Sequence, residues 1–251
     1  MNYIIITGAS RGLGEAFAQN FMKSGNHIFC IARTKNIELI NLAKEMNVGL
    51  DYLAYDLTQA NQVHFMMKEI SSKINMNEAQ SLLLINNAGT VTPITTIEKC
   101  KSEEIIHNVT LNLVTPMILV SEFIKHFGQW KIEKRIINIS SGAGKKPYFG
   151  WSCYCTSKAG LDMFTKCVAV EQETKEYPVK IISVAPGVID TNMQKEIRST
   201  APEDFMQVER FIEMKEKGRL FAPEYVANKI INVVFNESIE NGAVIDIGDY
   251  I

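Results

Sequence analysis

Short apolar runs rich in β-branched residues alternate along the chain with longer segments in which apolar residues recur every three or four positions. The short runs predict strands, which lie at residues 2–6, 27–32, 50–55, 81–85, 135–139, 179–185 and 243–247. The longer segments predict helices, which lie between the first turn and residue 25, around residues 39–46, and at 63–74, 102–127, 151–170 and 223–235.

This alternation predicts the fold class and the domain organisation. It is typical of an α/β protein with a doubly wound, seven-stranded parallel sheet, helices on both faces, and ligands beyond the carboxyl ends of the strands. The sequence contains no linker, internal repeat or low-complexity segment, so we expect one domain over residues 1–251. The polar segment at about 188–222, with a helical middle, is expected to form a lid over the site.

Composition and charge indicate which binding partners, which cellular location and which metal sites are to be expected. A net charge of −2 over 251 residues does not favour nucleic acid or an anionic membrane. The N-terminus lacks the basic and apolar regions of a signal peptide, and no apolar run approaches the length of a membrane span. The five cysteines are odd in number and irregularly spaced, and the four histidines form no ligand-spaced cluster. We therefore expect a cytoplasmic protein with reduced thiols and no bound metal.

A glycine-rich turn, TGASRGLG, occupies residues 7–14 between the first strand and the first helix. Glycines let the backbone bend sharply and approach a pyrophosphate, while the helix that follows supplies N–H groups and a positive dipole. The alternative is a plain tight turn, but a strand before it and a helix after it are the context that a dinucleotide site requires. The turn predicts a single-domain Rossmann fold, with cofactor contacts at Gly8, Ser10, Arg11, Gly12, Leu13 and Gly14.

The end of the second strand predicts which nicotinamide cofactor binds. At this point of a dinucleotide fold, an acidic residue binds the 2′-hydroxyl of NAD, whereas an arginine accommodates the 2′-phosphate of NADP. Arg33 follows the strand and no Asp or Glu occurs between residues 28 and 37, so we expect NADP(H). The alternative for Arg33 is an ordinary solvated side chain. Asp56, with Leu57 after it, ends the third strand as either an adenine contact or a helix N-cap.

Small residues follow the fourth strand. Asn87, Ala88 and Gly89 let the backbone pass close to a ligand there. Asn112 is an amide within the mostly apolar helix at 102–127, and its hydrogen bonds are either purely local or part of the site.

Tyr154 and Lys158 stand four residues apart in the helix that begins near residue 151, so their side chains share one face of it. A cation beside a phenol favours the phenolate and lowers the phenol pKa toward neutrality, as acid–base catalysis requires. The same spacing also arises by chance, with a tyrosine at the edge of the core beside a solvated lysine. The pair alone therefore does not decide between chemistry and packing.

The motifs occur in one order over nearly the whole chain: the glycine turn, the small-residue turn, Asn112, Ser141, the Tyr154–Lys158 pair and Pro186-Gly187. In this order they resemble the short-chain dehydrogenase/reductase family. The resemblance implies that Tyr154 is the general acid and that Lys158 lowers its pKa and binds the nicotinamide ribose. It implies that Ser141 orients the carbonyl and that Asn112 holds a water in a proton relay. Further cofactor contacts are implied at Asn87, Ala88, Gly89, Tyr154, Lys158, Pro186, Gly187, Val188 and Thr191.

Two groups within the family resemble the chain more closely. Residues 147–155 and 185–194 are similar to sepiapterin reductases, whereas residues 137–145 and 148–151 are similar to the bacterial benzil reductases that form (S)-benzoin, the closer resemblance of the two. Tyr148, Phe149 and Trp151 are expected either to line a pocket that accepts an aromatic substrate or only to pack beneath their loop. Asp246 matches the position of the aspartate that anchors the pterin in sepiapterin reductase.

Three functions remain as hypotheses. The leading one is an NADPH-dependent carbonyl reductase that transfers hydride to a ketone of an aromatic α-diketone, of the benzil type, or of a related dicarbonyl. The second is a pterin side-chain reductase, and the third is a non-catalytic NADP-binding sensor or scaffold. Intact Ser141, Tyr154 and Lys158 argue against the third, because binding alone needs no proton donor. The family commonly pairs subunits through two long helices, here 102–127 and 152–176, so we expect a homodimer or homotetramer.

Overall fold

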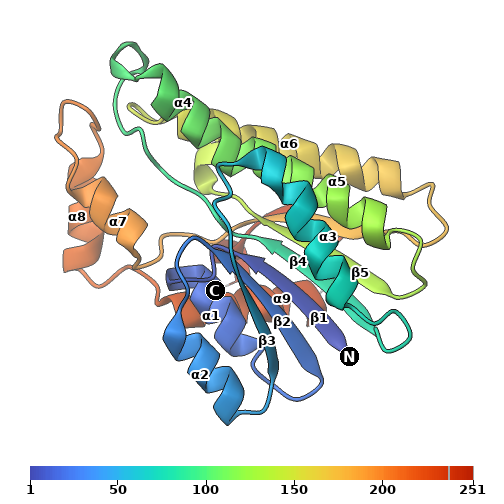
Figure 1. Ribbon diagram of the computed structural model, residues 1–251. Coiled ribbons are helices and arrows are strands. Elements are labelled where there is room, and N and C mark those ends of the chain that lie inside the picture. The colour runs from blue at the N-terminus through green and yellow to red at the C-terminus, as the bar shows by residue number, and fades with distance from the viewer. Residues whose placement is uncertain (237, 251) are drawn as a thin grey trace.

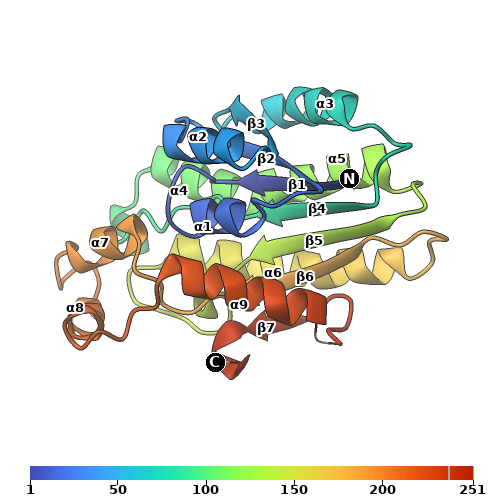
Figure 2. The ribbon, with the colours of Figure 1, turned by 90° about the horizontal axis from the view of Figure 1, so that it is seen from below.

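The computed structural model describes residues 1–236 and 238–250, so residues 237 and 251 of the predicted domain lie outside the described residues. Its centre is a seven-stranded parallel sheet in the order β3-β2-β1-β4-β5-β6-β7 (Figures 1 and 2). The strands are β1 Asn2–Thr7, β2 Asn26–Ala32, β3 Gly49–Ala54, β4 Ser81–Asn86, β5 Glu133–Ile139, β6 Lys180–Ala185 and β7 Val244–Asp246. The predicted Rossmann fold class is confirmed, with each strand within two residues of its expected bounds.

Helices cover both faces of the sheet because the strands alternate apolar side chains between two cores. Ile4 and Ile6 of β1 pack in one core and Tyr3 and Ile5 in the other. Figure 2 shows the layer of α1 and α9 in front of the sheet, with α3, α5 and α6 behind it. The first layer is α1 Gly12–Asn20, α2 Ile37–Glu45 and α9 Pro223–Asn236; the second is α3 Val63–Lys73, α4 Ser102–Val109, α5 Thr115–Phe127 and α6 Ser152–Gln172.

Helices α4 and α5 are joined by a π-helical turn, η3 Thr110–Val114, into one helix of 26 residues. By length and mean hydropathy this helix meets the requirement for a membrane span. The expectation that no apolar segment approaches that length is therefore wrong. Helices that cover the sheet of a soluble protein meet the same requirement, and α5 packs against both α3 and α6.

The segment at 188–222 lies beyond the carboxyl ends of the strands, where Figure 1 shows α7 and α8 set apart from the two helical layers. It carries α7 Asn192–Arg198 and α8 Val208–Glu216, and a bridge between Ile189 and Phe221 closes it at its base. That this segment moves as a lid stays a prediction. Short 3₁₀ turns complete the fold: η1 Ala60–Gln62, η2 Ile97–Lys99, η4 Gly142–Gly144 and η5 Ile247–Tyr250.

Candidate active site

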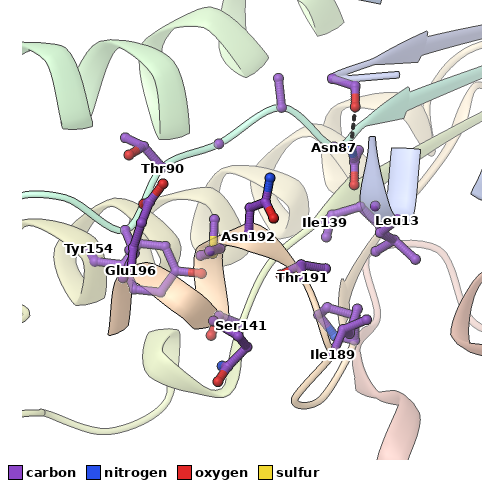
Figure 3. Close-up of a pocket in the computed structure, with 18 of the residues that line it drawn as sticks. Leu13, Asn87, Thr90, Ile139, Ser141, Tyr154, Ile189, Thr191, Asn192 and Glu196 are labelled. Carbon is purple, nitrogen blue, oxygen red and sulfur yellow. Dashed lines mark hydrogen bonds between the residues drawn. The ribbon is translucent and has the colours of Figure 1, made fainter. Parts of the chain in front are cut away.

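One cavity of about 990 Å³ runs along the carboxyl ends of the strands. It extends from the glycine turn and the end of β2, across the ends of β4, β5 and β6, to the segment that carries α7. Figure 3 shows Leu13 and Asn87 at one end of the cavity and Thr90, Tyr154 and Glu196 at the other. The site thus occupies the crevice that a doubly wound fold offers to a dinucleotide.

The glycine turn forms a cradle whose shape depends on close backbone contact. A Cβ on Gly14 would lie 2.2 Å from the carbonyl oxygen of Gly8, and Gly8 itself has a φ of +69°. The Thr7 hydroxyl accepts hydrogen bonds from the N–H groups of Asn87 (2.9 Å) and Ala88 (3.1 Å). Thr7 therefore joins the turn after β1 to the turn after β4, and the open face of both can receive a pyrophosphate at the N-terminus of α1. These residues fit a nicotinamide dinucleotide.

The end of the cavity at β2 carries the predicted adenosine contacts. Arg33, Arg11 and Ser10 line it together. Asn36 donates hydrogen bonds to the Ser10 carbonyl (3.1 Å) and to Glu15 Oε1 (2.9 Å), which fixes the turn beside the arginines. This end of the cavity thus carries two cations, Arg11 and Arg33, and one carboxylate, Glu15.

Asp56 and Leu57 line the same end of the cavity. Asp56 Oδ1 accepts hydrogen bonds from the N–H (3.0 Å) and hydroxyl (2.9 Å) of Thr58, so it caps the turn that follows β3. Asp56 lies on the cavity wall but is not a helix N-cap, because the N-caps of η1 and α3 are Gln59 and Gln62. Its contact with an adenine stays a prediction.

Ser141, Tyr154 and Lys158 meet at the ends of β5 and α6. All three line the cavity, and the Ser141 hydroxyl acts to lower the pKa of Tyr154. Ser141 Oγ also accepts a hydrogen bond from the Ala143 N–H at 3.1 Å, which leaves the hydroxyl proton available to an acceptor. Lys158 Nζ donates to the carbonyl oxygen of Ile139 at 2.8 Å and lies 5.7 Å from the centroid of the Tyr154 ring.

Burial dominates the ionisation of this group. It raises the pKa of Tyr154 to about 12, a rise that the Ser141 hydroxyl opposes. Burial thus outweighs any lowering by Lys158, whose Nζ lies over the ring and donates to Ile139, and the role of Lys158 in favouring the phenolate stays a prediction. Burial also lowers the pKa of Lys158 to about 8, against the opposing charge of Asp162. At neutral pH the Tyr154 phenol is protonated, which is the form that a general acid requires.

Asn112 lies behind the cavity wall. It is fully buried, and its amide donates hydrogen bonds to the Thr90 carbonyl (2.8 Å) and to Asn108 Oδ1 (3.0 Å). Asn112 Oδ1 accepts from the Thr90 N–H at 2.9 Å, and Asn108 Oδ1 also accepts from the Ser157 hydroxyl at 3.2 Å. The network ties the loop after Gly89 to α4 and α6. The role of Asn112 in holding a relay water stays a prediction.

An aromatic wall closes the other end of the cavity. Trp151 stacks on Phe205 with ring centroids 4.5 Å apart, and it contacts Phe211 at 5.6 Å and Tyr148 at 5.1 Å. Tyr148, Trp151 and Phe211 line the cavity, as does Asp246.

Phe149 has a different position. It is 43 % exposed and does not line the cavity, because its side chain turns to solvent just before Gly150, which is buried at a φ of +77°. The expectation that Phe149 lines a substrate pocket is therefore corrected.

The structure brings most of the predicted site residues to this one cavity. The exceptions are Gly14, which lies beneath the cradle, Asn112 and Phe149. The predicted residues that line it are Gly8, Ser10, Arg11, Gly12, Leu13, Arg33, Asp56, Leu57, Asn87, Ala88, Gly89, Ser141, Tyr148, Trp151, Tyr154, Lys158, Pro186, Gly187, Val188, Thr191 and Asp246.

Sequence reasoning missed the residues that hold others in place. Thr7 and Asn36 fix the turns of the cradle, and Asn108 completes the network around Asn112. Asn108 carried a usable signal, since a second amide four residues before Asn112 shares its helix face. Glu196 and Phe211, on α7 and α8, carried none, because their place on the cavity wall depends on how a distant segment packs.

The chain is similar to proteins of known class over its full length. The sequence model of the family described as short chain dehydrogenase matches residues 2–202. A benzil reductase ((S)-benzoin forming) of Bacillus cereus is 52 % identical, covering 99 % of this chain and 100 % of the relative. A sepiapterin reductase of Xenopus laevis is 28 % identical, covering 98 % and 95 %. The crystal structure of the KRED1-Pglu enzyme has a TM-score of 0.83 at 29 % identity, covering 98 % of this chain and 100 % of that chain.

These likenesses agree with the order of motifs and with the position of the cavity in the fold. The predicted resemblance is confirmed, as is the expectation of an enzyme. The chain belongs to the short-chain dehydrogenase family and is an oxidoreductase that uses a nicotinamide cofactor and acts on carbonyl or alcohol groups.

Proposed function

We propose that the protein is an NADPH-dependent carbonyl reductase that reduces one ketone of an aromatic α-diketone or a related dicarbonyl. One observation carries the proposal: the hydroxyls of Ser141 and Tyr154 line the cavity between the dinucleotide cradle and a wall made of Tyr148, Trp151 and Phe211. Flat aromatic substrates gain contact area and stacking energy against such a wall. The similarity to a benzil reductase along the whole chain supports the same substrate class.

The chain's own residues supply the acid and the positioning for this reaction. The bound cofactor supplies hydride to the carbonyl carbon, and negative charge then develops on the carbonyl oxygen. Tyr154, protonated at neutral pH, donates its proton to that oxygen, while the Ser141 hydroxyl donates a hydrogen bond to it. Lys158, held by Ile139, places a cation beneath the Tyr154 ring and favours the phenolate that forms.

The preference for NADPH over NADH rests on the charges at the end of β2. Arg33 and Arg11 line the cavity there, and the sequence between residues 28 and 37 offers no carboxylate for a ribose diol. A 2′-phosphate would be bound by charge-assisted hydrogen bonds, which are roughly twice as strong as neutral ones.

The test is loss of NADPH absorbance with benzil, with sepiapterin and with no substrate, each repeated with NADH. We expect turnover with benzil and NADPH, and chiral chromatography of the product then gives its handedness. A protein that oxidises no NADPH across a broad carbonyl panel contradicts the proposal and favours a sensor or scaffold. Equal rates with NADH and NADPH contradict only the cofactor preference.

A pterin side-chain reductase is the second candidate, and Asp246 is the observation that favours it. Asp246 ends β7, lines the cavity and is only partly buried, so its carboxylate can reach a ligand. Asp246→Asn should abolish turnover of sepiapterin under this alternative and leave turnover of benzil nearly unchanged under the leading one.

Assembly and location form a further part of the proposal. The helices expected to pair subunits carry exposed apolar residues: Ile106, Val114 and Met117 on the α4–α5 helix, and Met163 and Val170 on α6. We expect a cytoplasmic homodimer or homotetramer that buries these faces, because exposed apolar patches commonly mark interfaces. Light scattering at micromolar concentration that gives a monomeric mass contradicts this part alone.

A further inference from the structure

A row of buried polar side chains crosses the sheet beneath the catalytic group. Asn86 of β4, Asn138 of β5 and Ser183 of β6 stand side by side in the strand register, and none is more than 3 % exposed. Asn86 donates a hydrogen bond to Asn138 at 2.8 Å, and Asn138 donates to the Thr165 hydroxyl of α6 at 2.8 Å. The row therefore fixes where α6, the helix that carries Tyr154 and Lys158, lies on the sheet.

Asp162 is the charged residue in this polar contact between α6 and the sheet. It is 8 % exposed, and its Oδ1 accepts a hydrogen bond from the Ser183 hydroxyl at 2.6 Å. Its Oδ2 lies 2.8 Å from where a Cβ of Gly144 would be, so the carboxylate also reaches the turn that follows Ser141. Asp162 stands four residues after Lys158, which places the two on one face of α6.

We propose that Asp162 is a positioning residue for Lys158: its buried carboxylate, held by Ser183, keeps the lysine charged beneath Tyr154. The inference rests on the proposed function only in that Lys158 serves carbonyl reduction. A buried ammonium needs a buried counter-charge, since desolvation otherwise drives it to the neutral form. Lys158 is 5 % exposed, and within residues 1–236 and 238–250 its one hydrogen bond, to Ile139 O, brings no negative charge.

The other ionisable groups around Lys158 are better solvated than Asp162. Tyr154 shares α6 and is protonated at neutral pH. In the described part of the chain, the remaining groups that line this part of the cavity are exposed or half-buried: Lys145 and Lys146 after η4, His107 of α4, Glu196 of α7 and Asp246 of β7. Water screens such charges more than a buried one. Asp162 is therefore the anion best placed to act on Lys158.

Asp162→Asn tests the proposal, because it removes the charge while its Oδ1 still accepts from Ser183. We expect the rate of benzil reduction to fall as pH rises and the Tyr154–Lys158 pair loses a proton. Removing a nearby negative charge makes that proton easier to lose, so we expect the midpoint of this fall to move down by about one pH unit. Titration of the Lys158 Nζ resonance by NMR of ¹⁵N-lysine protein, assigned with Lys158→Met, should move in the same direction.

Two variants separate charge from structure. Glu171→Gln makes the same change of charge at an exposed position of α6, and Ser183→Ala keeps the Asp162 charge but removes its hydrogen bond. Both should leave the pH midpoint within about 0.3 units, although Ser183→Ala should lower the melting temperature. If Asp162→Asn does not fold, Asp162→Leu with Ser183→Ala removes the charge without leaving an unpaired partner.

The experiments distinguish a failure of the role proposed for Asp162 from a failure of the proposed function. An unchanged pH midpoint and an unchanged Lys158 titration in the charge-free variant overturn the role of Asp162. A parent protein that reduces no carbonyl overturns the proposed function alone, because the NMR titration still decides whether Asp162 holds the charge of Lys158.

Discussion

The two ends of the cavity differ in what forms their walls: backbone turns at one end and aromatic side chains at the other. The cofactor end is made of tight turns, where Gly14 has no room for a Cβ beside Gly8 and the Thr7 hydroxyl joins two turns. The substrate end is made of stacked side chains, where Trp151 meets Phe205 from a separate segment. A turn depends on the identity of a few residues close in sequence, whereas a stacked wall depends on how distant segments pack. The cradle therefore tolerates little change, and the wall is where specificity can vary.

The largest effect is expected between the two ends, at Tyr154, the proposed acid. Tyr154→Phe removes one hydroxyl and little volume, so the cradle keeps its shape. General acid catalysis typically contributes about 10²–10⁴-fold, so turnover of benzil should fall by at least that factor. Single-turnover oxidation of NADPH, beside fluorescence titration of NADPH binding, measures both quantities. Reduction at the parent rate would show that Tyr154 is not the acid.

Gly14→Ala should damage the cradle next most strongly. The added Cβ would lie 2.2 Å from Gly8 O and 2.6 Å from Asn87 Nδ2, so backbone must shift. Overpacking of this kind costs about 1–3 kcal/mol of stability, and NADPH affinity should fall about tenfold or more. Gly142→Ala is the matched control, because no atom lies within 4 Å of its added Cβ. Urea denaturation and NADPH titration that find the two variants alike would contradict the close-contact argument.

Arg33→Asp should change the cofactor rather than the cradle. A charge-assisted hydrogen bond contributes about 1.5–3 kcal/mol, so the preference for NADPH over NADH should shift by about ten- to hundredfold. Lys35→Asp makes a similar change of charge two residues away, at an exposed side chain that does not line the cavity. The ratio of kcat/KM for the two cofactors is the measurement. A shift of equal size in both variants would mean that Arg33 acts only through general charge.

Phe211→Leu should affect the aromatic wall and spare the cofactor. Aromatic pairs contribute about 0.5–1.5 kcal/mol beyond buried area, so the KM for benzil should rise about two- to tenfold. The KM for a small aliphatic diketone should change less, since it gains less from stacking. Phe149→Leu is the control, because Phe149 is exposed and outside the cavity. An equal rise of the KM for benzil in both variants would indicate that Phe149 also contacts the substrate.

The last prediction concerns stability alone, and it is a dependence on pH. Burial lowers the pKa of Lys158 from 10.5 to about 8, so between these values the unfolded chain binds a proton that the folded chain has released. Stability from this group therefore rises with pH from about 8 toward 10, and Lys158→Met lacks the contribution. Urea denaturation of both proteins at pH 7.5, 8.5 and 9.5 should give a difference in unfolding free energy that grows in favour of the parent. A constant difference would mean that Lys158 titrates alike in both states.

The same contrast explains how far the sequence could predict the structure. All seven strands were predictable, because a parallel sheet buried on both faces needs continuous apolar runs that stand out from the helical segments. The cradle was predictable because glycines at residues 8, 12 and 14 have few roles other than close approach.

The sequence could not predict that burial would dominate the pKa of Tyr154. A spacing of four residues gives the nearness of Lys158 but not the depth of either side chain, nor the Ile139 carbonyl that accepts the hydrogen bond of the lysine. Nor could it separate Trp151 from Phe149 two residues earlier. One is 4 % exposed and the other 43 %, a difference set by the buried Gly150 at a φ of +77° and by Phe205 from another segment.

The π-helical turn Thr110–Val114 makes the α4–α5 helix sensitive to a change in chain length. Such a turn holds one more residue than an α-helical turn would, and each residue of an α-helix advances the chain by about 100°. Deleting any one of its residues would restore a regular helix and rotate one half against the other. Either Asn112 would leave the Thr90 loop, or Phe123 would leave the core beneath α5. Surface loops of proteins commonly tolerate the gain or loss of a residue, whereas we expect this helix to tolerate changes of sequence but not of length.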